Sequence, residues 1–203
     1  MSRFPSAVLA VAAALLAIWP AFGADYAVRT QANGDVVLTL SGPITPVDGA
    51  SFLLEVNRSR PRIVELEGMG GDVLSAARIG VIIHERQMWT HAIGPCRSAC
   101  AYIWIAGAKM LVDEGVEIAN HLPVAAHGEF EGMPHQRAIA LFGWYLGKLN
   151  ISLEMMDAFI DTATARGATP NQYFDMLAFA RYWNAPVQLM PGTPDAILAV
   201  DDE

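Results

Sequence analysis

The chain has 203 residues, of which 53% are hydrophobic, 17% are charged and 9% are aromatic. This composition excludes disorder for most of the chain, and the length suits one globular domain. The 21 acidic residues outnumber the 13 basic ones, which gives a formal net charge of −8. An acidic chain without a Lys- or Arg-rich run argues against nucleic-acid binding, and two cysteines are too few for a disulfide scaffold.

The first 23 residues have the three parts of a secretory signal peptide. The basic Arg3 precedes an apolar run over residues 7–19, and Ala21 and Gly23 are small residues suited to a cleavage site. The run is short for a membrane-spanning helix, which needs about 20 apolar residues, although an uncleaved N-terminal anchor is the alternative. We therefore expect residues 1–23 to be removed and the mature protein to be periplasmic or secreted in a bacterium, without membrane attachment.

Residues 24–190 are expected to form a single domain. Residues 27–40 alternate around Asn33-Gly34, which predicts a β-hairpin. The spacing of apolar residues beyond it predicts further elements. These are, in chain order, a helix over residues 46–58, a strand over 62–66, a glycine turn over 68–71, a helix over 73–84 capped by Asp72, and a strand over 89–93 ended by Gly94-Pro95.

The apolar run over residues 98–108 fits either a buried helix or a buried strand, and its alanines and its length favour the helix. The second half of the chain is mostly helical by its apolar spacing. Its expected elements are strands over residues 110–112 and 116–119, a surface loop over 122–135, helices over 136–150, 152–166 and 169–183, and a loose tail over 191–203. Alternating strands and helices predict an α/β fold with right-handed crossovers.

Three segments combine residues that suit catalysis. Gly70-Gly71 joins a strand to a helix, where backbone N–H groups are able to stabilise a developing negative charge, although a tight turn without a ligand is the simpler alternative. Ser98 also precedes a helix, with the Ala99 N–H beside it, and serves either as a nucleophile or only as a helix cap. His121 ends a strand and suits a general base, although a surface histidine is the commoner case.

The order of these segments resembles the superfamily of the Clp protease proteolytic subunit, signal peptide peptidase A and the crotonase enzymes. That superfamily has an oxyanion-hole Gly-Gly, a nucleophilic serine before an Ala-Gly-Ala stretch, and a histidine that ends a strand before proline. The matching residues here are Gly70-Gly71, Ser98 with Ala106-Gly107-Ala108, and His121 with Pro123. The resemblance covers residues 36–124 best and is greatest to small exported Clp-protease-like proteins. It implies repeated ββα units followed by a helical C-terminal part.

The resemblance further implies an exported serine peptidase-like hydrolase that uses no ATP and no cofactor. Ser98 would attack the peptide carbonyl, and His121 would take its proton and return it to the leaving amine. The oxyanion would be held by backbone N–H groups, those of Gly70 or Gly71 and of Ala99. The substrates would be peptides or unfolded protein chains, and the superfamily's trimers and stacked rings imply a homo-oligomer.

The third residue of such a site, an acid that orients the histidine, is the least defined. Asp175 is the nearest candidate, Asn171 and Asp161 are alternatives, and a dyad is also open. The segment before the glycine pair reads Glu-Gly-Met where the superfamily has Asn-Ser-Pro. These departures make a catalytically inactive binding or scaffold protein the second hypothesis. A crotonase-like acyl-thioester enzyme is the third hypothesis. It ranks below the other two because an exported protein rarely meets coenzyme A.

Cys96 and Cys100 lie on either side of Ser98. In an oxidising compartment a disulfide between them would fix the backbone around the serine, while packed free thiols or a redox pair are the alternatives. The remaining ligand-type residues, His121, His127 and His135, are six and eight residues apart and lack the spacing of a helical zinc site. We therefore expect no metal.

Overall fold

The computed structural model describes residues 23–120, 135–152, 154, 174–182 and 185–191. Within them, eight strands form one sheet. The strands are β1 (Asp25–Thr30), β2 (Val36–Ser41), β3 (Ile63–Gly68), β4 (Trp89–Arg97), β5 (Met110–Asp113), β6 (Ile118–Asn120), β7 (Phe174–Asp175) and β8 (Val187–Met190). The helices are α1 (Asp48–Ser59), α2 (Val73–Glu85), α3 (Ala99–Trp104), α4 (His135–Lys148) and α6 (Met176–Tyr182).

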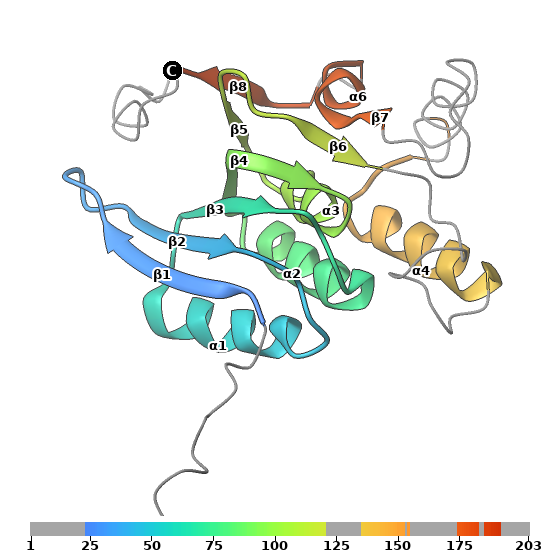
Figure 1. The fold of residues 1–203 in the computed structure, drawn as a ribbon, viewed down its shortest axis with the longest axis horizontal. Helices are drawn as coiled ribbons and strands as arrows, with labels where there is room; N and C mark the ends of the chain where they lie inside the picture. The colour runs from blue at the N-terminus through green and yellow to red at the C-terminus, as the bar shows by residue number, and fades with distance from the viewer. Residues whose placement is uncertain (1–22, 121–134, 153, 155–173, 183–184, 192–203) are drawn as a thin grey trace, which may run out of the picture.

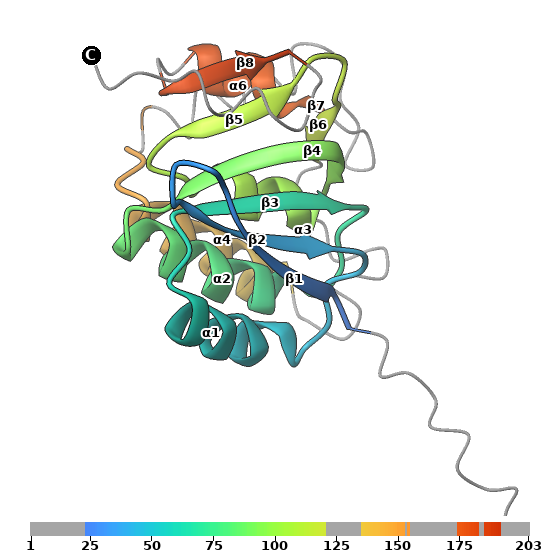
Figure 2. The same ribbon diagram turned by 90° about the vertical axis from the view of Figure 1, so that its left-hand side faces the viewer.

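The sheet has the order β1-β2-β3-β4-β5-β8, and the short strands β6 and β7 extend from β4. β1 is antiparallel to β2, whereas β2, β3, β4, β5 and β8 are parallel to one another. Helices α1, α2 and α3 lie together on one face of the sheet, and α6 lies near β8 at its far edge (Figure 1, Figure 2). Parallel strands joined through helices on one face confirm the predicted α/β class.

The predicted hairpin around Asn33-Gly34 is also confirmed. The Asn33 side-chain oxygen accepts a hydrogen bond from the Asp35 N–H at 3.0 Å, and Gly34 has a φ of 91°, which glycine adopts at little cost. The turn sets the register of β2, which directs Leu38 and Leu40 toward the helices. Both side chains are buried in the core between the sheet and the helical layer.

The strand β4 is longer than predicted, because Gly94-Pro95 does not end it. Its register against β3 shifts between the pairs Leu66–Ala92 and Gly68–Cys96, so extra residues of β4 bulge at this point. A bulge allows Pro95, which has no N–H to donate, to lie within a strand. Beyond the bulge, β4 changes its partner from β5 to β6, and this brings its last residues beside the end of β6.

The run over residues 98–108 forms a buried helix, as predicted, but the helix ends at Trp104. Its chain then turns back onto β4, where the Thr90 hydroxyl donates a hydrogen bond to the Trp104 carbonyl at 2.6 Å. A Cβ at Gly107 would overlap the Thr90 side chain, so this close approach requires a glycine. Tertiary contact, rather than the local sequence, therefore sets the length of α3.

The C-terminal part differs from the expected single helix over residues 169–183. Phe174–Asp175 forms the strand β7, which pairs with β6, and the helix α6 begins only at Met176. The strand β8 follows and adds to the sheet beside β5, where no element was predicted. The wider boundaries of the domain stay a prediction, because the expected helix over residues 152–166 lies almost wholly outside the described residues.

A row of polar side chains crosses the face of the sheet opposite the helices. This polar row consists of Arg29, Thr39, Glu65, His91 and Asp113. Thr39, Glu65 and His91 are neighbours in register on β2, β3 and β4, and Glu65 and His91 are 6% and 1% exposed. Arg29 binds both carboxylate oxygens of Glu65, at 2.8 and 2.6 Å, and His91 contacts Asp113 at 2.7 Å.

The carboxylate of Glu65 is the electrostatic centre of the polar row. Burial alone would raise the pKa of Glu65, but His91, Arg29 and Thr39 stabilise the charged form and lower this pKa to about 2. The Thr39 hydroxyl donates to the carboxylate at 2.8 Å, and His91 Nδ1 lies 3.7 Å from it. A buried charge is thus tolerated here because its neighbours replace the lost water.

The expected signal peptide lies outside the described residues except for Gly23, and so does the tail except for Pro191. The expected loop over residues 122–135 falls outside as well, except for His135. In the part of the chain that is described, none of the helices combines the length and the apolar character needed to cross a membrane.

Candidate functional site

Ser98 is the best-defined residue of the candidate site. It lies at the junction of β4 and α3 with a φ of 52° and a ψ of −120°, and it is fully buried. A residue other than glycine pays on the order of 1–3 kcal/mol for such a conformation, so the surrounding contacts must impose it. The side chain forms no capping hydrogen bond to α3, which removes the simpler reading of Ser98 as a helix cap.

Two backbone hydrogen bonds hold the serine turn. The Ser98 N–H donates to the carbonyl of Ala119 on β6 at 2.8 Å, and the Ser98 carbonyl accepts from the Tyr102 N–H at 3.2 Å. The first bond ties the turn to the sheet and the second ties it to the helix. A serine on a sharp strand-to-helix turn is the arrangement that positions the nucleophile in several hydrolase folds.

The glycine turn lies directly against the serine turn. Gly70 and Gly71 have φ values of 105° and 138°. A Cβ at Gly70 would lie 2.7 Å from Ser98 Cβ and 2.9 Å from the Ala99 nitrogen, and a Cβ at Gly71 would overlap the Ile44 carbonyl. Both positions therefore require glycine for close approach as well as for conformation. The structure brings together the two segments that the sequence singled out.

The glycine turn is fixed from its other side by Ile44. The Ile44 N–H donates to the Gly70 carbonyl at 2.9 Å, and the Asp72 N–H donates to the Ile44 carbonyl at 2.8 Å. Asp72 caps α2 by accepting from the Ser75 N–H at 2.7 Å, as its position predicted. Within the described residues, the N–H groups of Gly70 and Gly71 have no acceptor. Gly70 itself is buried, and Gly71 is half-buried.

The strand β6 leads toward the predicted base. It pairs with the end of β4 through Arg97–Ala119 and ends at Asn120, which is 1% exposed. His121 is the next residue and lies outside the described part of the chain. Its pairing with Ser98 therefore stays a prediction.

Asp175, the predicted third residue, lies on β7 opposite Ala119. Its carboxylate is exposed and caps α6, because one oxygen accepts from the Leu177 N–H at 2.9 Å and from the Ala178 N–H at 3.1 Å. The strand pairing puts Asp175 on the neighbour of the strand that precedes His121. The alternatives Asn171 and Asp161 lie outside the described residues.

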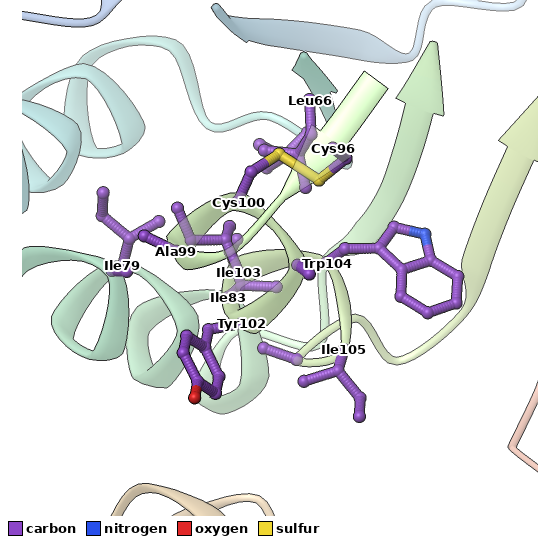
Figure 3. Close-up of a cluster of buried hydrophobic side chains, with 14 of the residues drawn as sticks. Leu66, Ile79, Ile83, Cys96, Ala99, Cys100, Tyr102, Ile103, Trp104 and Ile105 are labelled. Carbon is purple, nitrogen blue, oxygen red and sulfur yellow. A yellow bond between two sulfur atoms is a disulfide. The ribbon is translucent and has the colours of Figure 1, made fainter. Parts of the chain in front are cut away.

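The two cysteines form a disulfide around the serine. The Cα atoms of Cys96 and Cys100 are 5.1 Å apart, and both residues are buried. Figure 3 shows the bond against Leu66, with Ala99 and Ile79 among the neighbouring apolar side chains. The bridge thus joins the end of β4 to the first turn of α3.

A small apolar pocket of about 10 Å³, which is room for about one water molecule, lies beside this junction. It is lined by Tyr102, Ile105, Asn120, Phe142, Leu146, Met176 and Phe179. Sequence reasoning missed this pocket, because α3, α4, β6 and α6 each contribute only one or two of its residues. The one available signal was the aromatic character of the helical half, which equally fits core packing.

The expectation of no metal stays a prediction. Among the described residues, no three His, Cys, Asp or Glu side chains are grouped closely enough to hold a metal ion. Arg97, next to the serine, forms an ion pair with Glu117 of the segment before β6. His121 and His127 lie outside the described residues, as does the side chain of His135.

Solved structures share this fold. ClpP1 from Listeria monocytogenes aligns with a TM-score of 0.52 and 14% sequence identity, over 77% of this chain and 92% of that one. A single-residue mutant of the same protein aligns with a TM-score of 0.53 and 14% identity, over 79% of this chain and 94% of that one. The chain has a ClpP-like fold. No family model and no curated protein matches the sequence.

Proposed function

We propose that the protein is an exported serine hydrolase that cleaves peptides or unfolded protein chains without ATP. One observation carries the proposal: Ser98 is held at a φ of 52° against Gly70, on the junction of a strand and a helix. The Ser98 side chain does not cap its helix, so helix capping does not explain this conformation. Strained backbone of this kind is concentrated at functional sites.

The proposed reaction begins when the Ser98 hydroxyl attacks the peptide carbonyl. His121 takes the hydroxyl proton and later passes it to the leaving amine, while Asp175, Asn171 or Asp161 orients the imidazole. Water then attacks the acyl-enzyme with the same histidine as base, which releases the acid product and restores Ser98. The reaction consumes one water molecule for each bond cleaved and requires no cofactor.

The oxyanion formed in each step would be held by backbone N–H groups. Gly70 or Gly71 supplies one donor and Ala99 the other, on the two turns that touch each other. Loss of one such donor typically costs about 3 kcal/mol of transition-state stabilisation.

The location and assembly of the protein follow from the sequence alone in this proposal. Cleavage after Gly23 would release the mature chain into the periplasm or the medium, where ATP is scarce and an ATP-driven unfoldase has no fuel. Substrates would therefore have to be short or already unfolded. A homo-oligomer is proposed by analogy with the superfamily.

A fluorophosphonate probe, which reacts covalently with activated serines, tests the proposal. Wild type should be labelled at Ser98, and Ser98→Ala should lose labelling and peptide cleavage by at least about 10³-fold. Ser75→Ala is the matched control, because Ser75 is equally buried but lies in α2. If wild type is folded yet unlabelled and cleaves no peptide library, the chain is not a serine hydrolase.

A binding protein without catalysis is the second candidate. The observation in its favour is that the Asp175 carboxylate already caps α6 through two hydrogen bonds. An acid committed to a helix end is less available to orient a histidine. Peptide binding without turnover, unchanged in Ser98→Ala, would favour this candidate.

A further inference from the structure

We propose that the Cys96–Cys100 disulfide holds Ser98 in its reactive backbone conformation, so that the hydrolase becomes active only after the two thiols are oxidised. The inference rests on the proposed function and deepens it. It makes the bridge a positioning element of the site, and it links activity to the compartment in which the chain folds.

The bridge spans the serine from one side to the other. Cys96 is fixed in the sheet, because it pairs with Gly68 of β3 and its N–H donates to the Glu117 carbonyl at 3.0 Å. Cys100 lies in the first turn of α3. The disulfide therefore closes a five-residue loop that has Ser98 at its centre.

Besides the bridge, two backbone hydrogen bonds to described residues help to keep the serine at a positive φ. Its N–H and its carbonyl each form one backbone hydrogen bond, to Ala119 and from Tyr102. In the reduced chain, rotation of the peptide between Arg97 and Ser98 would return the serine to a common conformation and turn its hydroxyl away from the glycine turn. Closing the loop removes most of these alternatives, because a short cross-linked segment has few conformations.

Burial makes the bridge a lasting feature rather than a rapid switch. Cys96 and Cys100 are 0% and 3% exposed, and the sulfur atoms lie among apolar side chains (Figure 3). Small thiols reach such a bond only when the protein opens. Oxidation would therefore take place during folding, and the folded enzyme would retain its activity afterwards.

The oxidation needs an external disulfide as its oxidant. One cysteine thiolate attacks the oxidant's disulfide, giving a mixed disulfide and releasing one thiol. The second thiolate displaces the other half, which forms the Cys96–Cys100 bond and releases a second thiol. Two protons and two electrons leave the cysteines, and the oxidant is reduced to two thiols. In a reducing compartment the bond does not form during folding, and the chain stays inactive.

The test compares the oxidised full chain with the variant that carries both Cys96→Ala and Cys100→Ala. The fluorophosphonate labelling rate of the double variant should fall by roughly 10- to 100-fold, because small misplacement of a nucleophile is costly. Hydrogen exchange at residues 97–99 should become faster in the same variant. Ile83→Val is the matched control, because it removes one buried methyl group from the same core and should label within twofold of wild type.

A second measurement covers the case in which the double variant does not fold. Wild type refolded in a phosphine reductant should be folded by circular dichroism but labelled slowly, and later refolding with oxidised glutathione should restore the rate. Equal labelling of the oxidised and reduced chains would overturn the inference and leave the proposed function intact. A reduced chain that does not fold would overturn it too, because the bond would then serve folding. Oxidised wild type without labelling would remove both proposals.

Discussion

The serine turn and the polar row differ in how the fold stabilises them. In the polar row, both carboxylate oxygens of the buried Glu65 accept hydrogen bonds from Arg29, and one of them also accepts from Thr39. At the serine turn, Ser98 is buried in a conformation that costs energy, and it is held by contacts from three separate segments. The rigid sheet thus supports a serine turn whose own backbone conformation is unfavourable.

The polar row and the serine turn lie on the same strands. β3 carries Glu65 near its middle and leads into the glycine turn, while β4 carries His91 and leads to Ser98. The polar row therefore braces the same two strands whose ends form the candidate site. Changes in the row should alter stability, and changes at the strand ends should alter reactivity.

The largest expected effect on stability comes from Glu65→Ala. The substitution leaves Arg29 without the carboxylate that it binds through two hydrogen bonds, while His91 keeps its contact with Asp113. It should cost about 3 kcal/mol of unfolding free energy, as breaking a buried pair does. The labelling rate of Ser98 should stay within twofold at temperatures where the protein is folded. Urea denaturation and probe labelling of the same samples measure the two effects.

Glu55→Ala is the control for this change, because Glu55 pairs with an exposed Arg58 on α1. A surface pair contributes only about 0–1 kcal/mol, so this variant should unfold nearly as wild type does. Equal stability losses in Glu65→Ala and Glu55→Ala would show that the polar row has no bracing role.

Gly70→Ala should change the reactivity of Ser98 more than the stability of the fold. The new methyl group would push into Ser98 and the Ala99 N–H, so the labelling rate should fall about 100-fold, equivalent to about 2.7 kcal/mol of activation free energy. The accompanying loss of stability should exceed the roughly 1 kcal/mol expected from the positive φ alone, because the methyl group also overlaps its neighbours. Labelling kinetics and thermal unfolding separate the two quantities.

The control for this variant is Gly34→Ala in the β1–β2 hairpin. Gly34 also has a positive φ, but a Cβ there would meet no atom within 4 Å. It should therefore lose about 1 kcal/mol of stability from its φ, and no reactivity. Comparable labelling of Gly70→Ala and wild type would mean that the contact between the two turns does not matter.

Local signals account for what the sequence predicted correctly. Asn33-Gly34 fixes its hairpin within a few residues, and Asp72 caps α2 from an adjacent position. The order of the motifs along the chain predicts that the glycine turn lies beside the serine turn. Its physical basis, the lack of a Cβ at Gly70 opposite Ser98, became visible only in three dimensions.

Non-local contacts account for what the sequence did not predict. Pro95 is accommodated in β4 because β3 shifts its register there, and β7 exists because β6 is available to pair with it. The positive φ of Ser98 follows from tertiary contacts, since serine has no preference for that region. Glu65 interrupts an apolar strand, but its partner Arg29 lies 36 residues away in the sequence.

The smallest predicted effect is the acid dependence of the polar row. The pKa of Glu65 is about 2 in the folded protein and 4.5 in its ordinary range, so the unfolded chain takes up the proton first as the pH falls. The contribution of the carboxylate to stability is complete above pH 4.5 and is lost as the pH falls toward 2. After allowance for solvent around the half-exposed Arg29, this contribution is about 2 kcal/mol. The variant Glu65→Gln cannot titrate at this position, so the stability difference between it and wild type should shrink over that pH window. A difference that stays constant from neutral pH to pH 2, measured by urea denaturation, would show that the charge on Glu65 is not what stabilises the sheet.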